Sequence, residues 1–100
     1  MEVEMSKRFT DRELYLIRNA INFSVLMHQL NIPCKEIEGF YRFLCPDCNE
    51  MRTAINPETN LGRCFRCNQN FNTIDISMKT WRMGFVDTVK QLKALFPTLC

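Results

Sequence analysis

Two pairs of cysteines constrain the fold of this 100-residue chain more than any other feature. Cys45 and Cys48 form the first pair, and Cys64 and Cys67 form the second after fifteen intervening residues. Two thiolates that are two residues apart can point at one ion from a tight turn, and two such turns complete a tetrahedron of sulfur ligands. The spacing therefore predicts one structural zinc ion held by these four cysteines. Because all four positions are filled by protein, such an ion has no open site for catalysis.

An asparagine directly follows each pair, Asn49 in one case and Asn68 in the other. The residue after the second cysteine of such a turn often needs a positive φ angle, which asparagine tolerates better than most residues. The two turns thus agree in spacing and in backbone chemistry. A thioredoxin-like redox pair would leave one of the two turns unexplained. Iron in a four-thiolate site stays open as an alternative, because spacing alone does not select the metal.

The composition is that of a small globular domain. Apolar residues make up 46% and charged residues 24% of the chain, and no apolar run approaches the roughly 20 residues that span a bilayer. The N-terminal stretch MEVEMSKRFTDRE is too polar for a signal peptide. We therefore expect a cytoplasmic protein without membrane contact, whose six cysteines do not form disulfides. Cys34 and Cys100 have no partner at ligand spacing and are interpreted as a buried small residue and a terminal thiol.

The hydrophobic periodicity predicts an α+β fold, with a small zinc ribbon flanked by helices, in a single domain over residues 1–100. One N-terminal helix is expected at about residues 10–31. It begins at a capping box formed by Thr10 and Glu13 and ends before Pro33.

The ribbon is expected at about residues 39–71 as a short antiparallel sheet. Its strand candidates lie at residues 39–44, 52–56 and 61–65. Two short helices are expected within residues 72–97. Asn72 caps the first of them, Gly84 separates the two, and Pro97 stops the second.

Several short motifs accompany the cysteines. They are the knuckle Cys45-Pro46-Asp47-Cys48, the turn Pro57-Glu58, the knuckle Cys64-Phe65-Arg66-Cys67, and Ile74-Asp75 at a helix start. Together, from Phe43 to Phe96, they resemble the N-terminal zinc-binding domain of DnaG-type DNA primases of bacteria and phages. Cys48 stands where that family usually has a histidine ligand. The polymerase core of the family does not follow, so the resemblance implies a non-catalytic module with no small-molecule substrate, either free-standing or one piece of a longer protein.

The resemblance also implies contact with single-stranded template DNA, in replication and primer synthesis or in a mobile element. The formal charge of +2 falls to zero once four thiolates and one Zn²⁺ are included, so such binding needs a local patch. The candidate residues for this patch are Arg42, Arg52, Arg63, Phe65 and Arg66. Arg63 and Phe65 alternate onto one face of the last strand, where the ring could stack on a base and the guanidinium could contact phosphate.

Two other interpretations stay open. The aromatic residues of the ribbon could simply pack the sheet, with Phe40, Phe43 and Phe65 against Trp81 and Phe85, while the arginines offset the charge of the zinc thiolates. Alternatively, the broadly apolar N-terminal helix could dock on a replication or transcription protein, which would make the chain a zinc-stabilised interaction module. The lone His28 is expected on the surface of that helix rather than at the metal.

Overall fold

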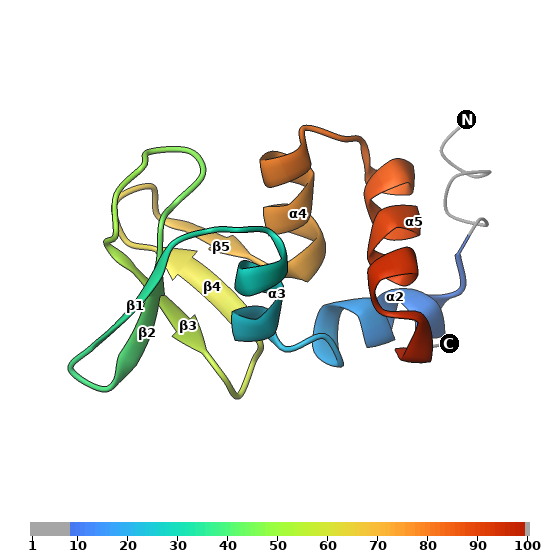
Figure 1. Cartoon of the computed structure of the whole chain (residues 1–100), viewed down its shortest axis with the longest axis horizontal. Helices are drawn as coiled ribbons and strands as arrows, with labels where there is room; N and C mark the ends of the chain where they lie inside the picture. Colours follow the sequence, from blue (N-terminus) through green and yellow to red (C-terminus); the bar gives the residue numbers. More distant parts are fainter. Residues whose placement is uncertain (1–8, 100) are drawn as a thin grey trace.

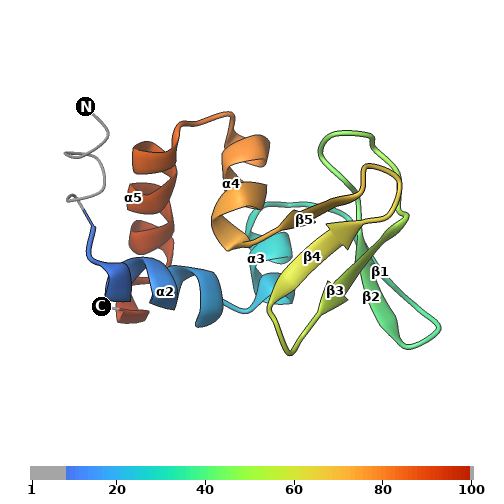
Figure 2. The same cartoon turned by 180° about the vertical axis from the view of Figure 1, so that it is seen from behind.

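The computed structural model describes residues 9–99 and has the predicted α+β class. Within these residues four α-helices form, namely α2 (Asp11–Asn19), α3 (Phe23–Gln29), α4 (Thr73–Trp81) and α5 (Phe85–Leu95). The strands gather at one end of the molecule, which is 42 Å long, and α2 and α5 lie at the other, with α3 and α4 between them (Figure 1). The view from behind shows the same order (Figure 2). A short 3-10 helix, Pro97–Leu99, follows α5 beside α2.

In the described part of the chain, five short strands form two antiparallel sheets. The strands are β1 (Cys34–Ile37), β2 (Phe40–Phe43), β3 (Thr53–Asn56), β4 (Leu61–Cys64) and β5 (Gln69–Phe71). β1 pairs with β2, and the second sheet has the order β3-β4-β5. The two sheets adjoin because β2 lies against β3. Arg63 is opposite Ala54 on one side and Asn70 on the other, so these three side chains share one face of the second sheet.

The three predicted strands and the two C-terminal helices are confirmed, but β1 and β5 were not predicted. The turn between β1 and β2 consists of Glu38 and Gly39, whose φ angles are 54° and 81°. Positive φ at both central residues is the mark of a tight hairpin turn whose twist matches that of the strands. The ribbon therefore begins before residue 39. At the other end of the chain, α4 ends at Arg82 with a φ of 55° rather than at Gly84, which instead caps α5.

The prediction of one continuous N-terminal helix is wrong. The chain leaves helical geometry between α2 and α3, and the side chain of Asn22 accepts a hydrogen bond from the Val25 amide to begin α3. The amide side chain of Asn60, in the β3–β4 turn, donates to the carbonyls of Arg18 at 2.8 Å and Ile21 at 2.6 Å. A residue distant in sequence thus satisfies the backbone groups that the break exposes.

The core joins α3 to the inner face of the second sheet. Phe43 is fully buried between Phe23 of α3 and Phe71 of β5, with ring centroids 5.6 and 6.4 Å away. Gly62 on β4 permits this contact, because a Cβ atom there would lie 2.7 Å from the Phe23 ring and 2.8 Å from the Phe43 ring. Since α3 covers the inner face, the outer face of β3, β4 and β5 is left free of helices (Figure 2).

Other local predictions can be compared with the structure directly. The capping box is present, because Thr10 Oγ1 accepts from the Glu13 amide and Glu13 Oε1 accepts from the Thr10 amide. His28 is exposed on α3, and Cys34 is half-buried rather than buried. Cys100 lies outside the described residues. None of the helices within residues 9–99 has the length and apolar character that a bilayer span requires.

Candidate metal centre and the adjoining strand face

The four predicted ligands converge. The sulfur atoms of Cys45, Cys48, Cys64 and Cys67 all lie within 4.8 Å of one another. Cys48 Sγ is 3.7 Å from Cys64 Sγ, and Cys45 Sγ is 3.9 Å from Cys67 Sγ. A tetrahedron with metal–sulfur distances of about 2.3 Å has edges of about 3.8 Å, so the arrangement fits one metal ion with four sulfur ligands.

The backbone of both knuckles has the predicted conformation. Asn49 and Asn68 have φ angles of 58° and 56°. The Asn49 amide donates to the Cys45 carbonyl at 2.9 Å, which closes the first turn, and the Cys67 amide donates to Cys64 Sγ at 3.4 Å in the second. The left-handed backbone conformation of these asparagines therefore lets each short loop direct its two cysteine sulfurs toward the same point.

Crowding of the thiols separates their acidities. Burial raises the pKa of Cys64, but hydrogen bonds from the Cys67 and Arg66 amides and from the Cys45 and Cys48 thiols outweigh it and bring this pKa to about 7. Burial and the three neighbouring thiols raise the pKa of Cys67 to about 12. Of these two thiols, Cys64 is therefore the more acidic. A bound divalent ion would deprotonate its ligands, because a coordinating thiol loses its proton.

The cluster is part of the core rather than a surface patch. Cys45 and Cys64 are fully buried, and Cys48 and Cys67 are half-buried. An ion pair of 3.2 Å between Lys79 on α4 and Asp47 connects the first knuckle to the helical part of the molecule. With four protein ligands and little exposure, the site is suited to holding the ribbon together.

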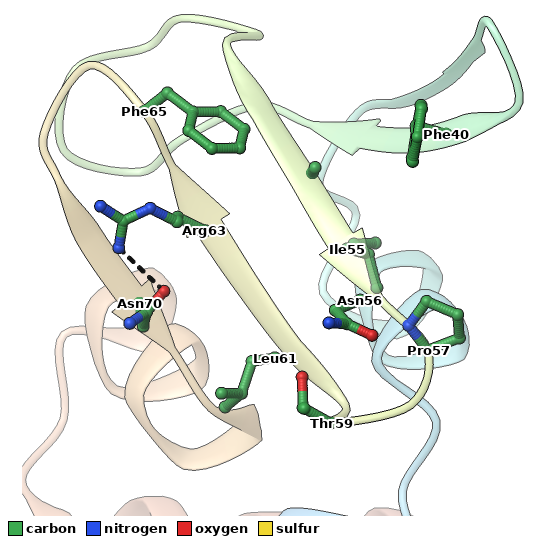
Figure 3. A pocket seen from close by; sticks show the side chains of 10 residues that line it. Phe40, Ile55, Asn56, Pro57, Thr59, Leu61, Arg63, Phe65 and Asn70 are labelled. Atoms are coloured by element: carbon green, nitrogen blue, oxygen red, sulfur yellow. Dashed lines mark hydrogen bonds between the residues drawn. The ribbon is translucent and has the colours of Figure 1, made fainter.

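A groove of about 490 Å³ lies beside this centre on the outer face of the second sheet. Arg63 and Phe65 line it from β4 and the residue after it, and Phe40 lines it from β2. Figure 3 shows the rings of Phe65 and Phe40 on opposite sides of β3. The guanidinium carbon of Arg63 is 5.8 Å from the Phe65 ring centroid, and its Nη1 donates to Asn70 Oδ1 at 3.1 Å. The guanidinium is therefore held beside an aromatic face.

Only two of the five residues predicted to contact DNA line this groove, namely Arg63 and Phe65. Arg42 is half-buried, and its Nη1 donates to the Thr53 carbonyl at 3.0 Å, so it helps to join β2 to β3. Arg52 and Arg66 are exposed but line no part of the groove.

The alternative that the ribbon aromatics only pack the sheet is wrong for two of three rings. Phe65 is 52% exposed and Phe40 is 56% exposed. Phe43 is a packing residue, but it contacts Phe23 and Phe71 rather than Trp81 and Phe85.

The sequence reasoning missed the other eight groove residues, among them Phe40, Asn56 and Asn70. The position of Phe40 could have been predicted from the turn dipeptide Glu38-Gly39. A two-residue hairpin turn there makes Phe40 the first residue of the returning strand. Asn56 and Asn70 follow from the strand register alone, since Asn70 is opposite Arg63 and Asn56 is two residues beyond Ala54 on the same face.

Neither a scan against protein-family models nor a search of curated proteins gives any match to this chain. The resemblance to primase zinc domains stays a prediction. The function must be argued from the cysteine cluster and the groove beside it.

Proposed function

We propose that this chain is a non-catalytic zinc module that binds single-stranded DNA through the outer face of β3, β4 and β5. Zinc is the ion of choice for a closed tetrahedral site with four thiolates, and iron is the alternative with the same geometry. The ion fixes the two knuckles. Because its ligand Cys64 is the last residue of β4, the ion also fixes the end of the strand that bears Arg63.

The observation that carries the proposal is that half-buried Arg63 and exposed Phe65 line the same open groove. An aromatic ring that is half exposed on a helix-free sheet face offers its surface to an unpaired base, and such stacking contributes about 1–3 kcal/mol per base. Arg63 has one N–H engaged by Asn70 and further N–H donors for a phosphate or base edge. Duplex DNA hides the faces of its bases, so this chemistry favours single strands.

The setting proposed for this binding is replication, with primer synthesis or a mobile element as the narrower choices. This setting is supported by the similarity in sequence of the two knuckles and the following helix to primase zinc domains. Of the five residues predicted to contact DNA, Arg63 and Phe65 are proposed to do so, together with Phe40.

The test is a binding titration of the metal-loaded full chain with a labelled single strand of about 12 nucleotides, followed by fluorescence anisotropy. We expect Phe65→Ala to weaken binding by about fivefold or more. Tyr15→Ala is the matched control, because it removes a 60% exposed ring from α2, away from the groove. Affinity should fall steeply between about 50 and 200 mM salt. Unchanged affinity in a combined Arg63→Ala and Phe65→Ala variant would remove this face as the binding site.

A second proposal is docking on a protein partner through the N-terminal helices. Tyr15 on α2 and Val25 on α3 are 60% and 47% exposed, which gives a partner two apolar contacts. Ile17, Leu26 and Met27 of the same segment are already buried within the chain. Since those residues are not free for a partner, the strand face has the stronger claim. Loss of a partner's binding in Tyr15→Ala, with DNA binding absent, would reverse that order.

A further inference from the structure

Two asparagines in the groove have their side-chain oxygens engaged by groups that can only donate. Asn56 Oδ1 accepts from the Glu58 backbone amide at 2.9 Å, and Asn70 Oδ1 accepts from Arg63 Nη1 at 3.1 Å. Neither a backbone N–H nor a guanidinium can accept a hydrogen bond. Each asparagine must therefore turn its oxygen to that partner, and its NH₂ group is left for other contacts.

The polar lining of the groove is consequently rich in donors. Figure 3 shows the nitrogen of Asn56 directed across the groove toward β4. Arg63, on the opposite strand, can only donate. Among the other lining side chains, only Thr59 has an oxygen that could accept a hydrogen bond. A ligand that enters the groove beside the Phe65 ring thus meets N–H groups at its edges.

We propose that this groove holds one unpaired base by its acceptor edge and so prefers the keto bases, guanine and thymine, over the amino bases, adenine and cytosine. This inference rests on the proposed function, because it names which single strands the same face selects. Guanine presents O6 and N7, and thymine presents O4, as acceptors where adenine and cytosine carry an amino group. An amino group in this position would face Asn56 and Arg63 as donor against donor, and its own hydrogen would lack a partner.

The dimensions and the apolar lining suit such a ligand. The volume of about 490 Å³ falls within the range of small-molecule sites, which is roughly 300–1,000 Å³. Leu61 and Ile55 contribute apolar side chains to the lining, and the two exposed phenylalanines supply ring faces. Stacking on these rings is available to every base, so the choice among bases falls to the edge contacts.

The test compares two single strands in one assay with the metal-loaded full chain. One strand of about 12 nucleotides alternates thymine and guanine, and the other alternates cytosine and adenine. Both alternate pyrimidine with purine, and neither forms Watson–Crick pairs with itself. We expect the thymine–guanine strand to bind about fivefold more tightly or better.

Asn56→Asp tests the donor itself. The carboxylate can still accept from the Glu58 amide, so the turn keeps its hydrogen bond while the groove loses the NH₂ group. We expect both affinities to fall with the added negative charge and their ratio to approach one. Asn31→Asp carries the same charge change at an exposed asparagine outside the groove and should keep the ratio of the unmodified chain.

The outcomes separate this inference from the proposed function. Equal affinity for the two strands, with Phe65→Ala weakening both, would overturn the base preference and leave single-strand binding standing. Tighter binding of the cytosine–adenine strand would also overturn it. A preference that survives Asn56→Asp unchanged would refute the role of Asn56. Absence of binding to either strand at about 50 mM salt would overturn the proposed function and this inference with it.

Discussion

Replacing Asn60 by aspartate should loosen the attachment of the N-terminal helices to the ribbon. The Asn60 NH₂ group donates to the carbonyls of Arg18 and Ile21, and its oxygen accepts from the Phe23 amide at 2.9 Å. Aspartate has nearly the same shape and can still accept from Phe23. It cannot donate, so two part-buried carbonyl oxygens would lose their donor and face a carboxylate.

The expected loss follows from those two contacts. Each unsatisfied polar group costs about 1–3 kcal/mol, so two fully buried groups would cost about 2–6 kcal/mol. Because this site is only part-buried, we expect about 2–4 kcal/mol. That is a large share of the roughly 5–15 kcal/mol that stabilises a typical domain. Backbone strain adds little, because Asn60 has a φ of 56° and aspartate also tolerates this region.

The assay is urea unfolding of the metal-loaded protein, followed by far-UV circular dichroism and by the fluorescence of Trp81. Asn31→Asp is the control. Its φ of 58° is nearly that of Asn60, but its side chain is exposed. The control should stay within about 0.5 kcal/mol of the unmodified chain. A loss below about 1 kcal/mol for Asn60→Asp would show that these hydrogen bonds do not hold the α2–α3 junction to the sheet.

Three further predictions concern the helices and the metal. Thr88→Val should stabilise the protein by up to about 1 kcal/mol, because the buried Thr88 hydroxyl has no hydrogen-bond partner among the described residues; a lower Tm would contradict this. The Lys93 ammonium, 2.6 Å from Glu13, and the Thr10 amide hold the pKa of Glu13 below its usual value of 4.5. The ionised Glu13 therefore stabilises the fold above pH 4.5, and this stabilisation is lost as the pH falls through the lower pKa of the folded state. Glu13→Gln should make the free energy of unfolding less dependent on pH in the acid range. An unchanged pH dependence would refute the contribution of Glu13. Removing the metal with a chelator should unfold the ribbon. Mass spectrometry of the loaded protein with thiol counting should find one bound ion and four protected cysteines. A Cys45–Cys48 disulfide without metal would contradict the metal site.

The metal site could be predicted because its determinants are local. The spacing within each cysteine pair and the asparagine after it, Asn49 or Asn68, define a turn without help from the rest of the chain. The same holds for the caps at Thr10 and Asn72, each of which closes with a residue three positions later. Local hydrogen bonds of this kind are visible in the order of the residues.

The parts that sequence reasoning missed depend on contacts between distant segments. The periodic apolar pattern runs through Asn22 without interruption, whereas the break there is stabilised by Asn60, 37 residues from its partner Phe23. Likewise, the positions of the aromatic residues in the sequence do not predict that Phe43 is buried while Phe40 and Phe65 are exposed. That outcome depends on which sheet face α3 covers, and Gly62 permits α3 to pack there because it leaves room for Phe23.

The most direct test of the proposed single-strand binding is a map of backbone amide chemical shifts in the metal-loaded protein as a single strand is added. We expect the amides of β3, β4 and β5 to shift, with the largest changes at Arg63, Phe65 and Asn70, while those of α2 stay in place. Shifts confined to α2 and α5, or none at saturating DNA, would contradict the proposed binding face.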